Sequence, residues 1–242
     1  MKVVITGTSN GIGLATAKKF LEQGHNVVGI DIENASNEII LDEKLSKNYT
    51  HFVCDISLPE TLPEISQVEI LVNNAGIQTA CKTVTGLEND SEITNIPRDI
   101  SVNLLGTMNV TEKYAFQKNI KSVLFNASVS ALNGNEFPAY VASKAGVVGY
   151  MKNCAIRLAN EFRATCNALC FGGVSTSLNA TVMEDKKLWQ KIMDVTPLKR
   201  WATAQQAAEW IYFMTVVNQN CTGQAIEISG GERNCADLFV WE

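Results

Sequence analysis

The fold is decided close to the start of the chain, by the stretch KVVITGTSNGIG at residues 2–13. Its first half is a short β-branched apolar run, which is typical of a buried strand. Its second half spaces Gly7, Gly11 and Gly13 so that the chain can turn tightly and bring its backbone close to a pyrophosphate. The helix expected from Ile12 then presents unpaired N–H groups and the positive end of its dipole to that anion. A strand, a glycine loop and a helix in this order predict a dinucleotide-binding unit.

The rest of the chain keeps alternating between short apolar runs and longer helical patterns. Continuous apolar strands separated by helices predict a parallel sheet covered on both faces, which is the doubly wound (Rossmann) α/β fold. The seven expected strands are Lys2–Thr6, Asn26–Asp31, Thr50–Cys54, Glu69–Asn73, Lys121–Ala127, Ala164–Cys170 and Ala225–Ser229. The expected helices are Ile12–Gln23, Pro97–Gln117, Tyr140–Glu161, Val182–Asp194 and Ala204–Val217. No linker, repeat or low-complexity tract interrupts this pattern, so we expect a single domain over residues 1–242.

Composition argues against several classes of function. A chain of 242 residues with a net charge of −5 and no basic cluster is not typical of proteins that bind nucleic acid or an anionic membrane. Seven cysteines without CxxC spacing and only two histidines present no metal-ligand pattern. Cys54, Cys154 and Cys170 lie in apolar segments, as reduced core thiols do. No apolar run approaches the ~20 residues of a membrane span, so we expect a cytoplasmic protein.

A carboxylate at the end of the second strand predicts which dinucleotide binds. Asp31 closes that strand, 18 residues after Gly13. A carboxylate at this position accepts hydrogen bonds from the adenosine ribose hydroxyls and repels a 2′-phosphate. No arginine stands beside Asp31 or within the loop of Thr8, Ser9 and Asn10. The sequence therefore favours NAD(H) over NADP(H) as the cofactor.

A tyrosine and a lysine one helical turn apart carry the expected chemistry. Tyr140 and Lys144 are spaced i, i+4, which places a phenol and an ammonium on the same face of a helix. A free tyrosine titrates near pH ~10 and is a sluggish acid at neutrality. An ammonium at roughly 5 Å stabilises the phenolate by about 3 kcal/mol at an effective dielectric of ~20. The pair therefore predicts a tyrosine that can transfer a proton at ordinary pH.

These residues, with five further motifs in order along the chain, resemble the short-chain dehydrogenase/reductase family in its form of about 250 residues. The resemblance covers the whole chain. The matching motifs are Thr6-Gly7-Thr8-Ser9-Asn10-Gly11-Ile12-Gly13, Asn73-Asn74-Ala75-Gly76, Val102-Asn103-Leu104-Leu105-Gly106, Asn126-Ala127-Ser128-Val129, Tyr140-Val141-Ala142-Ser143-Lys144, Asn167-Ala168-Leu169-Cys170-Phe171-Gly172, and Thr222-Gly223 with Gly230-Gly231.

The resemblance implies a role for each member of a catalytic set. Tyr140 would exchange a proton with a carbonyl or alcohol, and Lys144 would lower the pKa of that tyrosine and bind the nicotinamide ribose. Ser128 would hold and polarise the carbonyl oxygen, and Asn103 would position a water that relays protons to Lys144. The cofactor would supply the hydride chemistry, and the protein would supply alignment and charge. The residues expected to bind the cofactor are Gly7, Ser9, Asn10, Gly11, Ile12, Gly13, Asp31, Asp55, Ile56, Asn74, Ala75, Gly76, Tyr140, Lys144, Gly172, Val174 and Thr176.

The chain also departs from the family pattern. Ser128 and Tyr140 are 12 residues apart, one fewer than is commonest, and Ser130 is a nearby competitor for the serine role. Phe171 replaces the usual proline, so that the loop is less rigid or Phe171 forms a wall of the nicotinamide pocket. About 14 residues separate the third and fourth strands, so the helix between them is expected to be short or missing.

The substrate pocket is expected at Gln78, the 130–137 loop and the 173–200 segment. Its apolar residues would be Phe137, Leu178, Met183, Trp189 and Met193, and its polar ones Asn133, Asn135 and Asn179. Trp189 and Met193, four residues apart, line this pocket or form the packing stripe of a lid helix. The mixture suits a ketone or secondary alcohol of modest size with some apolar body.

The expected assembly is a homodimer or homotetramer built on the helices near 97–118 and 140–161, as is common in the family. The 140–161 helix is apolar on more than one face, so its own sheet or another subunit buries it. The apolar tail Asp237–Glu242 would cover a neighbouring subunit or the pocket of its own chain.

The predicted function is an NAD(H)-dependent oxidoreductase that interconverts a secondary alcohol and a ketone. One alternative is a 3-oxoacyl-thioester reductase using NADPH. Another is a regulator that binds NAD(H) without turnover, against which the complete set of Asn103, Ser128, Tyr140 and Lys144 argues. A sugar epimerase also uses Tyr and Lys, but 242 residues leave little room for its extra substrate domain.

Overall fold

Seven parallel strands form one sheet at the centre of the computed structural model, which describes residues 1–78, 91–135 and 137–232, leaving out the side chains of 91–95. Their order is β3-β2-β1-β4-β5-β6-β9. The strands are β1 (Lys2–Thr6), β2 (Asn26–Asp31), β3 (Tyr49–Val53), β4 (Ile70–Asn73), β5 (Ser122–Ser128), β6 (Thr165–Phe171) and β9 (Ala225–Ile228). The predicted fold class is confirmed, and each predicted strand boundary lies within one residue of the observed one.

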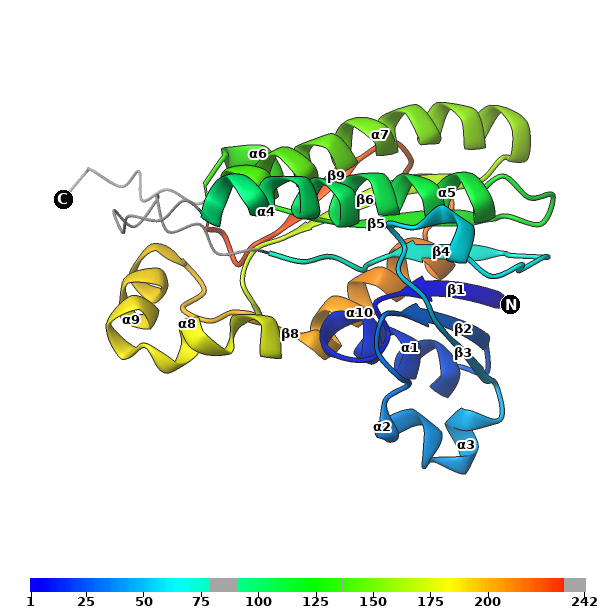
Figure 1. Cartoon of the computed structure of the whole chain (residues 1–242), viewed down its shortest axis with the longest axis horizontal. Coiled ribbons are helices and arrows are strands. Elements are labelled where there is room, and N and C mark those ends of the chain that lie inside the picture. Colours follow the sequence, from blue (N-terminus) through cyan, green and yellow to red (C-terminus); the bar gives the residue numbers. More distant parts are fainter. Residues whose placement is uncertain (79–90, 136, 233–242) are drawn as a thin grey trace.

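Helices cover both faces of this sheet (Figure 1). On one face lie α4 (Ser91–Ile100), α5 (Thr107–Tyr114) and the long α7 (Pro138–Phe162), and on the other lie α1 (Gly11–Glu22) and α10 (Ala204–Tyr212). The other α-helices in the described residues are α2 (Asn37–Ile40), α3 (Glu43–Ser46), α6 (Ser130–Asn133), α8 (Ala180–Glu184) and α9 (Lys186–Val195). Among the described residues a two-residue ribbon also pairs β7 (Val174–Ser175) with β8 (Ala202–Thr203), which the sequence did not predict.

Two hydrophobic cores result, because alternate side chains of a strand point to opposite faces of the sheet. In β1, Val4 packs into the core beneath α5 and α7, whereas Val3 and Ile5 pack into the core beneath α1 and α10. In β4, Leu71 lies in the first core, and its neighbours on either side lie in the second. Strands buried on both faces need apolar residues at every position, which is why the sequence shows them as continuous runs.

The helices differ from the prediction more than the strands do. The expected helix Pro97–Gln117 begins at Ser91, ends at Tyr114 and contains a π-helical segment at Ser101–Gly106. The expected helix Val182–Asp194 is two helices, because the Asp185 carboxylate accepts the backbone N–H groups of Lys187 and Leu188 and starts α9 anew.

Two further helices differ from the prediction in their bounds or type. The helix expected from Tyr140 begins two residues earlier, at Pro138, where proline suits the first helical turn. The helix expected over Ala204–Val217 is α-helical to Tyr212 and π-helical over Phe213–Val217. Between β3 and β4 the structure has only a 3₁₀ turn at Pro59–Thr61, in agreement with the expected short or missing helix.

The core also settles two predictions about packing. The apolar residues of α7, among them Val147, Met151 and Leu158, pack into the core of this chain, so its own sheet buries them. Cys54, Cys154 and Cys170 are buried free thiols, as predicted. The tail Asp237–Glu242 lies outside the described residues.

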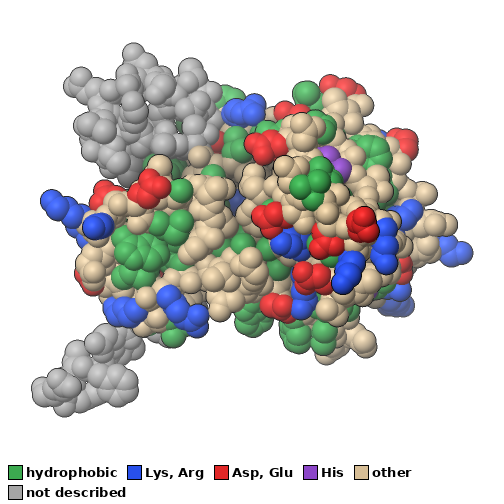
Figure 2. Space-filling view, turned by 90° about the horizontal axis from the view of Figure 1, so that it is seen from below, with side chains coloured by type: hydrophobic (Ala, Val, Ile, Leu, Met, Phe, Trp, Pro, Cys, Tyr) green, Lys and Arg blue, Asp and Glu red, His purple; other side chains and the backbone are tan. Residues whose placement is uncertain are grey.

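Charges are mixed on the surface that carries α1 and α10. Figure 2 shows acidic and basic side chains interspersed on this side of the molecule. Two of its ion pairs join Lys18 to Glu38 at 2.7 Å and Lys19 to Glu209 at 2.6 Å. No helix in the described ranges combines the length and the apolar composition that crossing a membrane requires.

Candidate active site

The glycine loop lies where β1 ends and α1 begins, and its three glycines each meet a requirement of the backbone or of space. Gly7 and Gly11 have φ angles of +75° and +56°, which favour glycine. A β-carbon on Gly13 would overlap the carbonyl oxygen of Gly7. The Asn10 side chain makes no capping bond to the first turn of α1. This backbone cradle at a helix N-terminus fits a pyrophosphate.

Asn74 and Ala75 close the other side of this loop, at the point where the order of the strands reverses. The backbone N–H groups of both residues donate to the Thr6 hydroxyl at 3.0 Å. The Asn74 amide nitrogen donates to the carbonyl oxygens of Thr6 at 3.0 Å and Gly7 at 3.3 Å. In open α/β sheets this switch point between β1 and β4 is the place where ligands bind.

Asp31 lies at the predicted adenosine end of the crevice. Its Oδ2 accepts the backbone N–H of Ser9 at 2.9 Å, and its Oδ1 accepts the backbone N–H of Glu33 at 3.0 Å. Each carboxylate oxygen has a further lone pair, so both oxygens can still accept a ribose hydroxyl. The structure thus joins the predicted ribose carboxylate to the predicted phosphate loop.

Asp55 and Ile56 follow β3 at the same edge of the sheet. One oxygen of the Asp55 carboxylate accepts the backbone N–H of Ser57 at 2.9 Å and its hydroxyl at 2.7 Å. The Ile56 side chain is buried against Gly106, so only the backbone of Ile56 is left to face a cofactor.

Lys144 is buried at the centre of the site. Its Nζ donates to the carbonyl oxygen of Asn126 at 3.0 Å and lies 5.6 Å from the centroid of the Tyr140 ring. Burial lowers the pKa of Lys144 from 10.5 to about 8, and nearby Cys170 acts in the opposite direction. The ammonium therefore still dominates at neutral pH, within reach of the tyrosine that it is predicted to activate.

Ser128 ends β5, two residues after Asn126, and its side chain is buried. The hydroxyl oxygens of Ser128 and Ser130 lie 2.8 Å apart, and the backbone N–H of Ser130 donates to Ser128 Oγ at 3.2 Å. The two serines expected to compete for one role are thus hydrogen-bonded partners.

Asn103 lies in the π-helical segment and ties three parts of the chain together. Its Oδ1 accepts the backbone N–H of Ile77 at 2.7 Å, and its Nδ2 donates to the Ile77 carbonyl at 2.8 Å and the Ser143 hydroxyl at 3.2 Å. A β-carbon at Gly76 would lie 3.1 Å from Asn103 Oδ1 and 3.3 Å from Lys144 Nζ. The amide of Asn103 and the ammonium of Lys144 therefore lie on the same side of Gly76.

Three of the predicted cofactor residues, Gly172, Val174 and Thr176, follow β6. A β-carbon at Gly11 would lie 3.6 Å from the Thr176 side chain, so Thr176 lies beside the phosphate loop. Gly172 donates its N–H to the Ile228 carbonyl, and a β-carbon there would crowd Ser229 and the end of the Glu232 side chain. Val174 is buried, with its carbonyl accepting the Asn179 amide. Phe171 is 3% exposed and packs into the core beneath α1 and α10, and does not form a wall of a pocket.

Trp189 and Met193 form packing contacts of α9, the helix expected to act as a lid. The Trp189 ring meets Trp201 edge-on at 4.9 Å between centroids, and Met193 is buried. A β-carbon on Gly173 would overlap the Trp201 indole. The two tryptophans therefore hold α9 against the turn that follows β6. Of the other predicted pocket residues, Leu178 and Asn135 are exposed, and Phe137, Met183, Asn133, Asn179 and Gln78 are half-buried.

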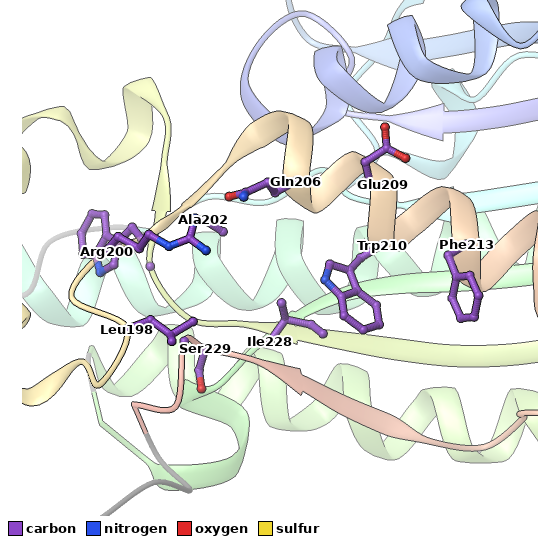
Figure 3. Close-up of a pocket in the computed structure, with 12 residues that line it drawn as sticks. Leu198, Arg200, Ala202, Gln206, Glu209, Trp210, Phe213, Ile228 and Ser229 are labelled. Atoms are coloured by element: carbon purple, nitrogen blue, oxygen red, sulfur yellow. The ribbon is translucent and has the colours of Figure 1, made fainter.

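A cavity of about 550 Å³ lies beside that turn, between α10, the end of β9 and residues 198–202 (Figure 3). Trp210, Phe213 and Ile228 form its apolar wall, with Arg200 and Glu209 among its polar residues. None of the predicted catalytic residues lines this cavity. Within the described ranges no group of three or more His, Cys, Asp or Glu side chains could hold a metal ion.

Comparison with known proteins places this geometry in a family. Residues 7–232 match the family model described as enoyl-(acyl carrier protein) reductase. The chain is 30% identical over 243 residues to 3-oxoacyl-(acyl-carrier-protein) reductase FabG of Thermotoga maritima, with 94% of this chain and 96% of that protein covered. The chain belongs to the short-chain dehydrogenase/reductase family. It is therefore an oxidoreductase with a Rossmann fold, as the motifs predicted.

Solved structures of other short-chain dehydrogenases agree with the fold. A 4-hydroxyisoleucine dehydrogenase complexed with NADH is 25% identical, with a TM-score of 0.82 and coverage of 97% of this chain and 99% of that one. A structure from Agrobacterium tumefaciens with bound NADP is 24% identical, with a TM-score of 0.84 and coverage of 96% and 95%. Both dinucleotides occur among these similar structures, so the fold does not decide which one this chain binds.

Two contributors to the site were not found from the sequence. Asn126 holds Lys144 through its backbone oxygen, and its side chain donates to Asn74 Oδ1 at 2.7 Å. Thr6 holds Asn74 and Ala75. The only signal was a polar residue inside or at the end of an otherwise apolar strand, which a buried hydrogen bond commonly explains.

Proposed function

We propose that this protein is an NAD(H)-dependent oxidoreductase that interconverts a secondary alcohol and a ketone. The observation that carries this proposal is the buried Lys144 ammonium, held by the Asn126 carbonyl beside the Tyr140 ring. Among the described residues no carboxylate pairs with Lys144, and burying an ammonium in this way costs free energy that packing alone does not require. This cost is explained if the ammonium serves to lower the pKa of the neighbouring Tyr140 phenol.

Each residue of the site has a distinct chemical role in this proposal. The Tyr140 hydroxyl donates a proton to the substrate carbonyl in reduction and removes one from the alcohol in oxidation. The Ser128 hydroxyl donates a hydrogen bond to the same oxygen as negative charge develops on it. Lys144 stabilises the phenolate by charge, and Asn103 positions the segment after β4 against α7. The cofactor, when bound, supplies or accepts the hydride.

The glycine cradle, Asn74 and Thr176 would hold the dinucleotide, and Asp31 favours NAD(H). The support for this choice is the carboxylate at the end of β2, which accepts the Ser9 N–H and stands beside a loop without lysine or arginine. The remaining cofactor residues named from the sequence lie at the same edge of the sheet, and their contacts with NAD(H) stay part of the proposal.

The second candidate is a 3-oxoacyl-thioester reductase that uses NADPH. The similarity to the reductase of Thermotoga maritima favours it, and Asp31 argues against it. Assembly as a homodimer or homotetramer also remains a proposal. Exposed apolar side chains on the outer face support it, with Leu105 49% and Ile156 64% exposed. The free cysteines support the predicted cytoplasmic location.

A substrate panel tests the proposal most directly. Simple secondary alcohols, polyols, ketones and 3-oxoacyl thioesters are assayed with NAD(H) and NADP(H) by the absorbance of the reduced nicotinamide. We expect turnover of an alcohol or ketone with NAD(H). Turnover confined to 3-oxoacyl thioesters with NADPH would replace the first candidate by the second. Tight NAD(H) binding without turnover of any member would favour a regulator.

A further inference from the structure

The loop after β2 is fixed at the backbone of one residue, Glu33. Its N–H donates to Asp31 Oδ1 at 3.0 Å. Its carbonyl oxygen accepts the His51 ring nitrogen Nε2 at 2.8 Å and the Ser9 hydroxyl at 3.4 Å. An exposed loop residue would ordinarily make its backbone hydrogen bonds with water, so three protein contacts at one residue hold Glu33 in one place.

His51 connects this point to the phosphate loop. A carbonyl only accepts, so Nε2 carries the proton, and in the neutral ring Nδ1 accepts from the Tyr49 hydroxyl at 2.9 Å. The Tyr49 oxygen in turn accepts from the Thr8 hydroxyl at 2.9 Å. A β-carbon at Gly29 would overlap both of these hydroxyl groups, so glycine at this position leaves room for the contact.

The fixed backbone directs the Glu33 carboxylate toward the phosphate loop. Its Oε2 lies 3.5 Å from the Asn10 amide nitrogen, while Asp31 Oδ2 accepts the N–H of the preceding residue, Ser9. Two carboxylates therefore flank two consecutive residues of the loop beside the predicted ribose position. A 2′-phosphate of NADP(H) would bring a charge of about −2 close to both of them.

We propose that Glu33 is a second determinant of dinucleotide choice, which repels the 2′-phosphate together with Asp31, and that His51 is its positioning residue. This inference rests on the proposed NAD(H) site. It differs from the role of Asp31, because Glu33 acts by charge alone and is not needed to bind the ribose hydroxyls.

Equilibrium binding tests the role of Glu33 without any need for a substrate. Dissociation constants for NAD⁺ and NADP⁺ are measured by titration calorimetry on the wild type, Glu33→Gln and Glu38→Gln. Glu38 is the matched control, since it is also exposed but pairs with Lys18. In dilute buffer we expect Glu33→Gln to tighten NADP⁺ binding about fivefold and to change NAD⁺ binding less than twofold. Molar salt should remove most of the difference.

The role of His51 is tested by the same ratio of dissociation constants. His51→Leu removes the donor to the Glu33 carbonyl. It should lower the ratio of the NADP⁺ to the NAD⁺ dissociation constant about as much as Glu33→Gln does. His51→Gln keeps an N–H donor and should restore the wild-type ratio. A loss of thermal stability alone would lower the affinity for both dinucleotides and leave the ratio unchanged.

The failures can be told apart. An unchanged NADP⁺/NAD⁺ ratio in Glu33→Gln, or an equal change in Glu38→Gln, overturns the inference and leaves the proposed function standing. A wild type that binds neither dinucleotide overturns both. An unchanged ratio in His51→Leu removes His51 from the positioning role.

Discussion

The ammonium nitrogen of Lys144 lies 3.0 Å from the carbonyl oxygen of Asn126, two residues before Ser128 on the same strand. A residue of α7 is thereby tied to the strand that carries the predicted serine, at a depth where the lysine is 5% exposed. Burial lowers the pKa of Lys144 from 10.5 to about 8. The same burial that brings the lysine to the tyrosine makes the charged form costly for the fold.

Replacing Lys144 by Met should therefore stabilise the protein in the absence of cofactor. A pKa lowered by this amount corresponds to about 3 kcal/mol of cost for the folded ammonium, and the lost hydrogen bond offsets about 1 kcal/mol. Below pH 8 both states hold the proton, so the full gain of about 2 kcal/mol should appear at pH 7. Denaturant titrations measure it as the free energy of unfolding.

The lowered pKa of Lys144 also predicts how the stability difference between the wild type and Lys144→Met changes with pH. Between pH 8 and 10.5 the unfolded wild type still binds the proton and the folded wild type has released it, so wild-type stability rises. The advantage of Lys144→Met should thus shrink through this window and become a deficit of about 1 kcal/mol above it, where the wild type keeps its hydrogen bond without the charge. A difference in the free energy of unfolding that stays constant from pH 7 to 10.5 would mean that the charge of Lys144 does not destabilise the folded state.

Tyr140→Phe should abolish turnover and leave NADH binding nearly intact. The change removes only the hydroxyl, which the proposal assigns to proton transfer, and keeps the ring 5.6 Å from the Lys144 ammonium. Initial rates with the best substrate of the panel and calorimetric titration with NADH measure the two effects. Activity comparable to the wild type would remove Tyr140 from the acid/base role.

Ser130→Ala should lower kcat about tenfold with little effect on NADH binding. The Ser130 hydroxyl lies 2.8 Å from Ser128 Oγ, and both side chains are buried, so it orients the proton of Ser128. Ser130→Thr keeps the hydroxyl and serves as the control, with most of the activity expected to return. Equal loss in both variants would indicate damaged packing.

Gly173→Ala should displace the lid helix. The new methyl group would overlap the Trp201 indole, which packs edge-on against Trp189 of α9. We expect a changed tryptophan emission spectrum, a loss of about 1–3 kcal/mol of stability and a higher KM for the substrate. Gly149→Ala is the control, because its methyl group meets nothing within 4 Å and should stabilise α7 by about 0.5–1 kcal/mol. Unchanged tryptophan emission in Gly173→Ala would mean that the contact between Trp189 and Trp201 does not hold α9 in place.

The sheet could be predicted from sequence largely because its central strands are buried on both faces. Val3 to Ile5 and Ile70 to Val72 show no alternation with polar residues, and a glycine loop follows β1 directly. The predicted residues of the glycine loop, Asp31 and Asn74 could be placed for a related reason. They follow the carboxyl ends of parallel strands, which necessarily lie at one edge of the sheet.

The interactions that could not be predicted join residues distant in sequence or change helix type without changing composition. The π-helical segment around Asn103 keeps the apolar pattern of an α-helix, so nothing marks it. Trp189 packs against Trp201 only because α9 folds back over the turn after β6. The contact of His51 with Glu33 depends on the pairing of β2 with β3.

Asn126 links the two ends of the crevice by hydrogen bonds. Its amide holds Asn74 at the phosphate loop and its carbonyl holds Lys144 beneath the predicted nicotinamide position. By reciprocity, if docking of a dinucleotide changes the proton affinity of the lysine, protonation of the lysine changes the affinity for the dinucleotide by the same free energy. We expect such coupling to appear near pH 8, as proton uptake or release when a dinucleotide binds and before any substrate arrives.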